Sequence, residues 1–248
     1  MTVLILAAGY ATRLYPLTLN KPKPLLPVGG KPILEHIFER IGRLGRVNRC
    51  FIVTNQKFFG NFKEWAEKYE FKAPIEVIND ETTTNENRLG AIRDIEFVIK
   101  KKNIDDGLLV IGGDNLFEFD LKAFTEFAKA REPNSSLALF DIKDIQKANI
   151  YGVAKIDSSG KVVDFKEKST APESTLIATC VYYFPKEKLK LIPEYISLGN
   201  GHDAPGNYIK WLSEKGEMYG FVFKEAWYDI GDLESLKEAN RKYGNEKT

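Results

Sequence analysis

The chain has 248 residues, of which 43% are hydrophobic and 29% are charged, a composition typical of a globular protein with a sizeable core. Its 36 Lys and Arg residues nearly balance its 35 Asp and Glu residues, so no overall field attracts nucleic acid or a membrane surface. An anionic ligand would therefore have to be held by local groups.

Cysteine and histidine usage narrows the chemistry further. Cys50 and Cys180 are too few and too far apart for a disulfide framework or a thiolate metal site, and both are predicted to be small core residues in a reducing compartment. His36 and His202 are the only histidines, which disfavours Ser-His-Asp catalysis and a His-rich metal site. We predict a cytoplasmic protein, because the sequence shows neither a signal peptide nor the roughly 20 apolar residues of a membrane helix.

The first half of the chain alternates β-rich runs with helical patterns. Strands are predicted at residues 3–6, 49–54, 75–80 and 108–114, and helices at 32–45, 61–71 and 89–102. Pro32 suits the first turn of the first helix, and Gly45 suits its end. Strands separated by helices favour a parallel sheet covered on both faces, with ligands at the carboxyl ends of the strands.

From about residue 134 the pattern becomes richer in short strands. They are predicted at residues 135–142, 151–157, 161–168, 178–185 and 217–223, and helices at 206–215 and 233–243. The expected fold is α/β, a Rossmann-like three-layer sandwich with a mostly parallel mixed sheet. We predict a single domain over residues 1–248, with a nucleotide-type half at 1–133 and a more irregular half at 134–248.

The segment "LILAAGYATRLYPLTLNKPKPLLPVGGKP" begins within the first predicted strand and continues beyond its end. Its small residues at positions 7–9 let backbone amides approach an anion, and Arg13 offers a planar charged fork for phosphate oxygens. Lys23 stands between two prolines, which predicts a stiff extended segment. The segment is neither a Walker A loop nor a Gly-x-Gly-x-x-Gly motif. Its composition alone fits a phosphate site and a solvated basic loop equally well.

Three further motifs carry candidate groups. Asp114 in "VIGGDN" and Asp229 in "AWYDIGD" could bind a divalent cation together, although each alone also fits a turn or cap residue. Glu167 and Lys168 in "DFKEKS" end a predicted strand, and alternating charge of this kind is also typical of the wet face of a sheet.

The opening segment closely resembles the N-terminal signature of the sugar-phosphate nucleotidylyltransferases, or nucleotide-sugar pyrophosphorylases, and is similar to glucose-1-phosphate thymidylyltransferase-like enzymes. The resemblance continues in family order through "VIGGDN", "YGVAKID", "KEKS" and "WYDIGD". It implies the nucleotide-diphospho-sugar transferase fold, with a nucleotide-binding half at 1–133 and a sugar-phosphate-binding half at 134–248. It also implies that the substrates are a nucleoside triphosphate and a sugar 1-phosphate, and that the cofactor is Mg²⁺.

The resemblance assigns roles to individual positions. Arg13 would hold the triphosphate, Lys23 would neutralise charge at the α-phosphate, and Asp114 and Asp229 would bind Mg²⁺. The implied nucleotide-binding residues are Ala7, Ala8, Gly9, Thr12, Leu89 and Gly90, and the implied sugar-phosphate residues are Gly152, Glu167 and Lys168. Such a reaction depends on positioning and charge neutralisation more than on a protein base, which agrees with the scarcity of histidine.

The sequence departs from the family pattern in three places. The loop reads "GYATRL" where the family commonly has "GLGTRL" or "GxGTRM", so Tyr10 and Ala11 are expected to alter how the loop closes. Ser169 replaces the proline that usually follows Glu-Lys. The polar segment 82–88 is unusual before the Leu89-Gly90 pair and also fits a helix N-cap loop. In the family this region reads the nucleotide base, so the donor stays open between thymidylyl, uridylyl and cytidylyl nucleotides. Lys21 in the opening segment has no assigned role.

Two alternatives remain at this point. One is a cytidylyltransferase that acts on a non-sugar phosphate, and the other is a catalytically silent homologue that binds nucleotide to regulate a partner. Residues 201–211, "GHDAPGNYIKW", are expected to line the acceptor pocket and to distinguish the two enzymes. A C-terminal repeat domain is not expected, and the oligomeric state stays open, a homo-oligomer included.

Overall fold

The computed structural model describes residues 1–201, 203–216 and 218–244, and its first half alternates strands and helices as predicted. The strands are β1 (Thr2–Leu6), β4 (Arg49–Thr54), β5 (Ile75–Asn79) and β6 (Leu108–Gly112), and the helices are α1 (Ile33–Gly42), α2 (Phe59–Lys68) and α3 (Ala91–Lys102). Pro32 immediately precedes α1 instead of lying in its first turn, and the helix ends at Gly42 instead of Gly45.

The second half contains the predicted strands and helices with shifted boundaries. They are β8 (Ser135–Asp141), β9 (Gly152–Ile156), β10 (Val162–Glu167), β11 (Leu176–Phe184) and β12 (Met218–Phe223), with α6 (Pro205–Glu214) and α7 (Leu233–Gly244). The predicted strand at 217–223 begins with Glu217, which lies outside the described residues, as does His202.

Several short elements had no prediction. These are β2 (Pro27–Val28), β3 (Lys31–Pro32), β7 (Asn115–Phe117), β13 (Trp227–Asp229), α4 (Leu121–Lys129), α5 (Leu191–Ser197) and four 3-10 turns at Thr12–Leu14, Lys23–Leu25, Lys147–Ile150 and Lys186–Lys188. Two of them, β7 and β13, pair with each other and prove important for the site.

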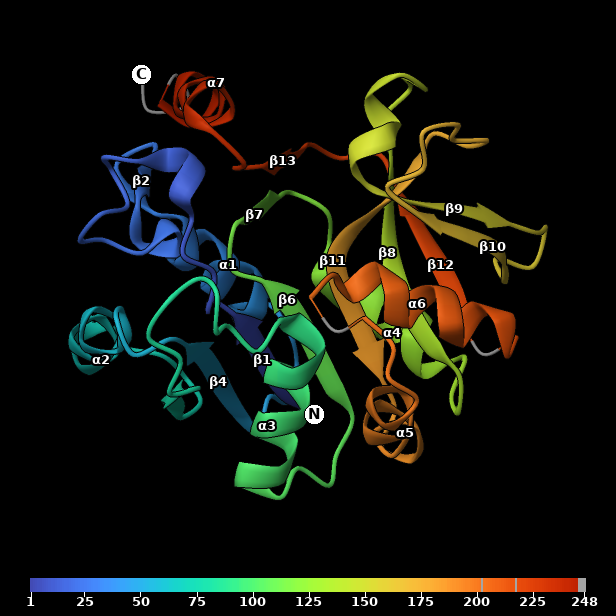
Figure 1. Cartoon of the computed structure of the whole chain (residues 1–248), viewed down its shortest axis with the longest axis horizontal. Coiled ribbons are helices and arrows are strands. Elements are labelled where there is room, and N and C mark those ends of the chain that lie inside the picture. Colours follow the sequence, from blue (N-terminus) through green and yellow to red (C-terminus); the bar gives the residue numbers. More distant parts are fainter. Residues whose placement is uncertain (202, 217, 245–248) are drawn as a thin grey trace.

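One mixed sheet of nine strands joins both halves in the part of the chain that the structure describes. Its main path runs β10-β9-β11-β6-β1-β4-β5, and β12 is attached through β8 to β11 (Figure 1). The strands β5, β4, β1 and β6 are parallel, whereas β11 runs antiparallel to β6. The second half is therefore bonded directly to the nucleotide-type half.

Helices cover both faces of this sheet. Val3 and Ile5 of β1 pack in a core with α1, α2 and α4, whereas Leu4 packs on the other face with α3, α5 and α6. This alternation follows from the two-residue period of a strand. The predicted three-layer α/β sandwich with a mixed sheet is confirmed. Over the described residues, no helix combines the length and hydrophobicity needed to cross a bilayer.

Candidate active site

The loop after β1 turns its backbone toward open space because neighbouring groups hold it from behind. The amide of Ala7 donates to the carbonyl of Val53 (2.9 Å), and the side chain of Asn55 donates to the carbonyl of Ala8 (2.9 Å). A Cβ built at Gly9 meets no atom within 4 Å. A ligand can thus come close to the main chain at this end of the sheet.

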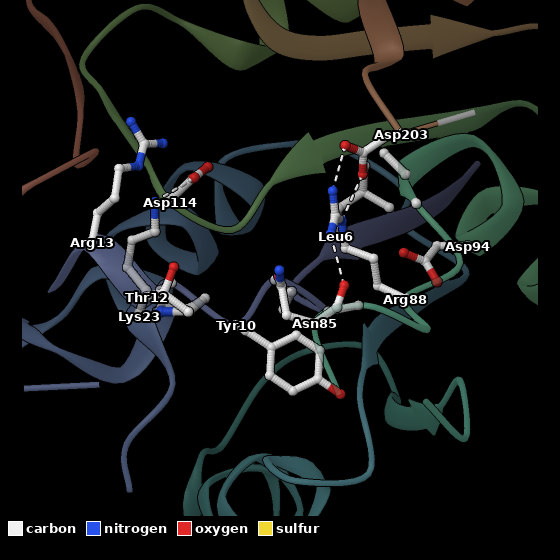
Figure 2. A pocket seen from close by; sticks show the side chains of 17 residues that line it. Leu6, Tyr10, Thr12, Arg13, Lys23, Asn85, Arg88, Asp94, Asp114 and Asp203 are labelled. Carbon is white, nitrogen blue, oxygen red and sulfur yellow. Dashed lines mark hydrogen bonds and ion pairs between the residues drawn. The ribbon is translucent and has the colours of Figure 1, made fainter. Parts of the chain in front are cut away.

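A cavity of about 470 Å³ lies against this loop (Figure 2). Two groups of lining side chains stand at its opposite ends, with Arg13, Lys23 and Asp114 at one and Asn85, Arg88, Asp94 and Asp203 at the other. The lining also includes five of the six positions expected to bind nucleotide, namely Ala7, Ala8, Gly9, Thr12 and Gly90. The end with Arg13 and Lys23 is the one that suits an anionic group.

A second cavity of about 600 Å³ shares Arg13 and Asp114 with the first as lining residues. Gly152, Glu167, Lys168 and Asp229 line it, as do Pro205 and Gly206 from the segment expected to form an acceptor pocket. The two sets of site residues predicted from separate motifs therefore border adjoining cavities.

The two predicted metal-binding carboxylates come together through a short antiparallel ribbon. Strand β13 pairs with β7 so that Asp229 lies opposite Asn115, the residue after Asp114. The amide of Ile230 donates to the carbonyl of Asp114 (3.3 Å). Backbone pairing between distant segments thus sets both carboxylates at one place.

Lys23 ties the opening segment to this ribbon. Its Nζ donates to Oδ2 of Asp114 at 2.7 Å and to the carbonyl of Ile230 at 2.8 Å. Only 13% of the Lys23 side chain is exposed, against 39% of the Asp114 side chain, so the ammonium group is largely shielded from solvent while the carboxylate stays partly accessible. Lys23 is therefore not part of a solvated basic loop, which was one of the two interpretations of the opening segment.

The backbone around Lys23 differs from the predicted extended segment. Pro22 is extended, but residues 23–25 form a 3-10 turn in which the amide of Leu25 donates to the carbonyl of Pro22 (3.0 Å). Pro24 fits the second position of such a turn because its amide is not needed there. The prolines therefore restrict Lys23 through a tight turn.

The charges at the ribbon influence each other strongly. Burial raises the pKa of Asp114, but the positive charges of Lys23 and Arg13 outweigh this effect and leave the pKa below its usual range. For Asp229, burial and the negative charge of Asp114 raise the pKa to about 6, against the opposing effect of Lys23 and Arg13. Two carboxylates held in this way repel each other, and a cation between them would relieve the repulsion.

Glu167 ends β10 at the second cavity and lies opposite Gly152 of β9. A Cβ built at Gly152 would lie 2.5 Å from Cζ of Phe165 and 2.7 Å from Oε2 of Glu167, so the missing side chain leaves room for both the ring and the carboxylate. Burial raises the pKa of Glu167, and Lys168 partly offsets this. Lys168 itself takes a left-handed turn (φ 48°), its amide donates to the carbonyl of Tyr151 (3.0 Å), and its side chain is exposed.

Leu89 is the one expected nucleotide-binding residue that does not reach the first cavity. It lines a separate surface depression with Arg93 and Phe97 of α3. Gly90, immediately before α3, takes a positive φ of 85° and borders the cavity instead. Leu89 and Gly90 are neighbours in the sequence, but only Gly90 borders the first cavity.

The polar segment 82–88 does not cap α3 through its side chains. The N-cap residue of that helix is Gly90, and no side chain accepts a hydrogen bond there. Oδ1 of Asn87 instead accepts from the amides of Thr83 (3.1 Å) and Thr84 (3.0 Å). These residues build a local turn that carries Asn85 and Arg88 to the cavity wall.

The unusual residues Tyr10 and Ala11 shape the opening loop. Tyr10 is buried at the cavity wall, and its ring centroid lies 6.4 Å from that of Phe58. Ala11 takes a left-handed φ of 49°, and its carbonyl accepts from the hydroxyl of Thr18 (2.8 Å). The loop therefore places an aromatic ring at the cavity wall and an alanine in the left-handed region, where the family pattern has leucine or a variable residue followed by glycine.

The structure also shows contacts between site residues that the sequence did not predict, and it places Asp203, from the segment 201–211 expected at the acceptor pocket, at the first cavity. Buried Asn115 donates to the carbonyl of Thr179 (2.7 Å) and accepts from Nε1 of Trp227 (3.1 Å), which braces the ribbon against β11. Arg88 binds Asp203 with two hydrogen bonds, from Nε to Oδ1 (2.9 Å) and from Nη2 to Oδ2 (2.8 Å). No local pattern signals such pairs because their members lie far apart in the sequence.

Cys180 was expected in the core, but it lines the second cavity at a bulge of β11. Its φ is 55°, a left-handed value that a cysteine rarely adopts. Burial raises the pKa of its thiol to about 12, so it is not poised as a thiolate nucleophile. Cys50 is buried as predicted.

Comparison with known proteins agrees with this geometry. A family model described as nucleotidyl transferase matches residues 2–246, and the chain belongs to this family. The family resemblance seen in the opening segment is thereby confirmed.

Individual relatives point the same way. Bifunctional protein GlmU of Methanocaldococcus jannaschii is 30% identical over 244 residues, covering 97% of this chain and 54% of that protein. GlmU of Methanococcus vannielii is 28% identical over 253 residues, with the same coverages of 97% and 54%. The chain thus spans about half the length of the curated relatives it matches. A solved UDP-glucose pyrophosphorylase complexed with UDP-glucose shares the fold, with a TM-score of 0.83 and 20% identity over 99% of both chains.

Proposed function

We propose that the protein transfers a nucleotidyl group from a nucleoside triphosphate to a sugar 1-phosphate, giving a nucleotide sugar and pyrophosphate. The observation that carries this proposal is the Lys23–Asp114 ion pair beside Asp229. It lies at the boundary of the two cavities, which share Arg13 and Asp114 as lining residues. A reaction between two phosphate esters needs such a charged junction between two binding sites. The names of the relatives, which include a UDP-glucose pyrophosphorylase, support the same substrate classes.

In this proposal the 470 Å³ cavity is the nucleotide cavity and the 600 Å³ cavity is the acceptor cavity. Arg13 would bind the β- and γ-phosphates, and Lys23 would neutralise charge at the α-phosphate. Lys168 would bind the acceptor phosphate and Glu167 a hydroxyl group of the acceptor. The base would lie at the end of the nucleotide cavity with Asn85 and Arg88, away from Lys23.

The bond changes need no protein base. An oxygen of the acceptor phosphate attacks the α-phosphorus, the new P–O bond forms, and the bond to the β-phosphate oxygen breaks as pyrophosphate leaves. The attacking phosphate is already an anion, so no proton has to be removed. The work of the side chains is to hold both reactants in line and to neutralise charge.

The carboxylates of Asp114 and Asp229 are hard oxygen donors of the kind that Mg²⁺ prefers. A bound Mg²⁺ ion would also offset the repulsion between the two carboxylates. No group of three or more His, Cys, Asp or Glu residues within the described ranges is arranged to bind a metal. Mg²⁺ would therefore complete its coordination with phosphate oxygens and water. When bound, it would supply charge stabilisation to the transferring phosphate.

A turnover screen tests the proposal. Five nucleoside triphosphates are combined with sugar 1-phosphates and with non-sugar phosphates, with and without Mg²⁺, and pyrophosphate release is measured. We expect release with at least one sugar 1-phosphate, in the presence of Mg²⁺ only. Turnover with non-sugar acceptors alone would refute the proposal and favour the cytidylyltransferase alternative. Nucleotide binding without any turnover would favour a regulatory homologue.

We further propose a cytoplasmic location, which two free cysteines support.

A further inference from the structure

Gly206 stands at the start of α6, at the wall of the acceptor cavity. A Cβ built at this position would overlap Oε2 of Glu167 and lie 2.6 Å from its Cδ. The same Cβ would lie 3.2 Å from Cε1 of buried Phe165. The carboxylate of Glu167 thus occupies the space that any larger residue at position 206 would fill.

We infer that Gly206 is a positioning residue for acceptor binding, because its missing side chain lets Glu167 keep its carboxylate in the acceptor cavity. The inference rests on the proposed function, which assigns this cavity to the phosphorylated acceptor. Gly152 leaves space for the same carboxylate from β9, so two glycines on separate elements determine where it stands.

The start of α6 is anchored and would not shift easily. Asp203 holds Arg88 through two hydrogen bonds, and its carbonyl accepts from the amide of Ala91 (3.3 Å). Farther along the helix, Ile209 and Leu212 are fully buried. Moving this helix would disturb both its core contacts and the wall of the nucleotide cavity.

Glu167 is the group that would give way. The overlapping atom is the far end of a flexible side chain, and its carboxylate forms no hydrogen bond with another residue in the described part of the chain. Rotation of this side chain relieves the overlap without moving the backbone. An added methyl group at position 206 therefore acts on the acceptor cavity more than on the fold.

A carboxylate in this cavity accepts hydrogen bonds, which suits an acceptor with hydroxyl groups. Its displacement should weaken binding of such an acceptor and leave the nucleotide alone, because Glu167 does not line the nucleotide cavity. We expect Gly206→Ala to raise KM for the acceptor by about 10-fold, the effect of losing one hydrogen bond to a charged group. KM for the nucleotide and the thermal unfolding temperature should stay close to wild type.

Gly60→Ala is the matched control. Gly60 is also the second residue of a helix, α2, and a Cβ built there meets no atom within 4 Å. This variant should keep wild-type KM values for both substrates. An equal rise in acceptor KM for Gly60→Ala and Gly206→Ala would overturn the inference.

A double-mutant comparison tests whether Gly206 acts through Glu167. Glu167→Ala should raise the acceptor KM by itself, and Gly206→Ala should add nothing in that background. The inference is wrong if Gly206→Ala raises the acceptor KM by the same factor in both backgrounds. These assays use whichever phosphorylated acceptor the wild type turns over.

A crystal structure of Gly206→Ala without substrate separates this inference from the proposed function. We expect the Glu167 side chain to be rotated away while α6 keeps its place. An unmoved Glu167 beside a shifted α6 would refute the inference. A wild-type enzyme that turns over no sugar 1-phosphate would refute the proposed function, and the crystal structure would still decide where Glu167 stands.

Discussion

The Nζ atom of Lys23 lies 2.7 Å from Oδ2 of Asp114, although 91 residues separate them along the chain. This ion pair connects the loop after β1 with the β7–β13 ribbon. It also places the one largely buried cation of the opening segment next to both carboxylates that would bind metal, within the residues the structure describes.

Replacing Lys23 should lower turnover far more than it lowers stability. We expect Lys23→Ala to reduce kcat by roughly 10² to 10³, the usual effect of removing one preorganised electrostatic contact. Steady-state kinetics with the best substrate pair measures the effect. Lys21→Ala is the control, because Lys21 is exposed and lies outside both cavity linings. Wild-type turnover in Lys23→Ala would remove this residue from the site.

Asp114→Asn should abolish magnesium-dependent turnover and leave the fold intact. The amide keeps the size of the side chain but loses the charge that would hold the cation and that pairs with Lys23. A magnesium titration of turnover, together with circular dichroism, measures both parts of the prediction. Asp105→Asn changes an exposed carboxylate away from both cavities and should behave as wild type. An unchanged magnesium titration in Asp114→Asn would contradict the assigned role.

Asn115→Ala should destabilise the fold by about 1–3 kcal/mol, because it leaves buried polar groups without partners. The groups affected are the carbonyl of Thr179 and the indole N–H of Trp227. Urea denaturation gives the free energy of unfolding. Asn61→Ala removes an exposed amide with one long hydrogen bond (3.3 Å) and should cost less than about 0.5 kcal/mol. Equal losses in the two variants would show that Asn115 does not brace the ribbon.

Asp94→Asn should stabilise the protein at neutral and alkaline pH. Burial and the negative charge of Asp80 raise the pKa of Asp94 well above its usual range. The folded state therefore holds this proton more tightly than the unfolded state, and stability is lost as the pH rises above the unfolded value of about 3.9 toward the folded pKa. Asparagine cannot ionise and avoids this loss.

Chemical denaturation at pH 5 and pH 8 measures the difference. The gain from Asp94→Asn should be larger at pH 8 and of the order of 1 kcal/mol or more there. Glu214→Gln, at an exposed position of α6, should keep the wild-type dependence on pH. A gain that is equal at both pH values would show that the ionisation of Asp94 does not limit stability.

Local patterns in the sequence were enough to predict the main layers of the fold. The apolar run at β1 and the helical spacing of α1 depend on residues close together in the chain, and both elements appear at the predicted places with shifted boundaries. Helix α4 also had a local signal, since Asp120 caps it by accepting from the amide of Lys122 and its apolar residues are spaced by three and four. That helix could have been predicted.

The proximity of Asp114 and Asp229 could not be predicted from local sequence patterns. It depends on β7 and β13, which have three residues each and are too short to show a period. The resemblance to a family assigned both residues to one metal, but only the pairing of the two strands explains why they meet. Leu89 is a different case, because it lines a separate depression while its neighbour Gly90 borders the first cavity, and no local pattern distinguishes these two adjacent positions.

The ribbon has a consequence for the order in which the site forms. Apart from Asp203, the residues that line the nucleotide cavity lie within the first 114 positions, whereas β13 begins at Trp227. Contacts between such distant segments form late, because closing a long loop costs entropy before pairing offsets it. A chain still being synthesised can thus form most of the wall of this cavity before β13 has been made, and Asp229 joins the site only once β13 pairs with β7.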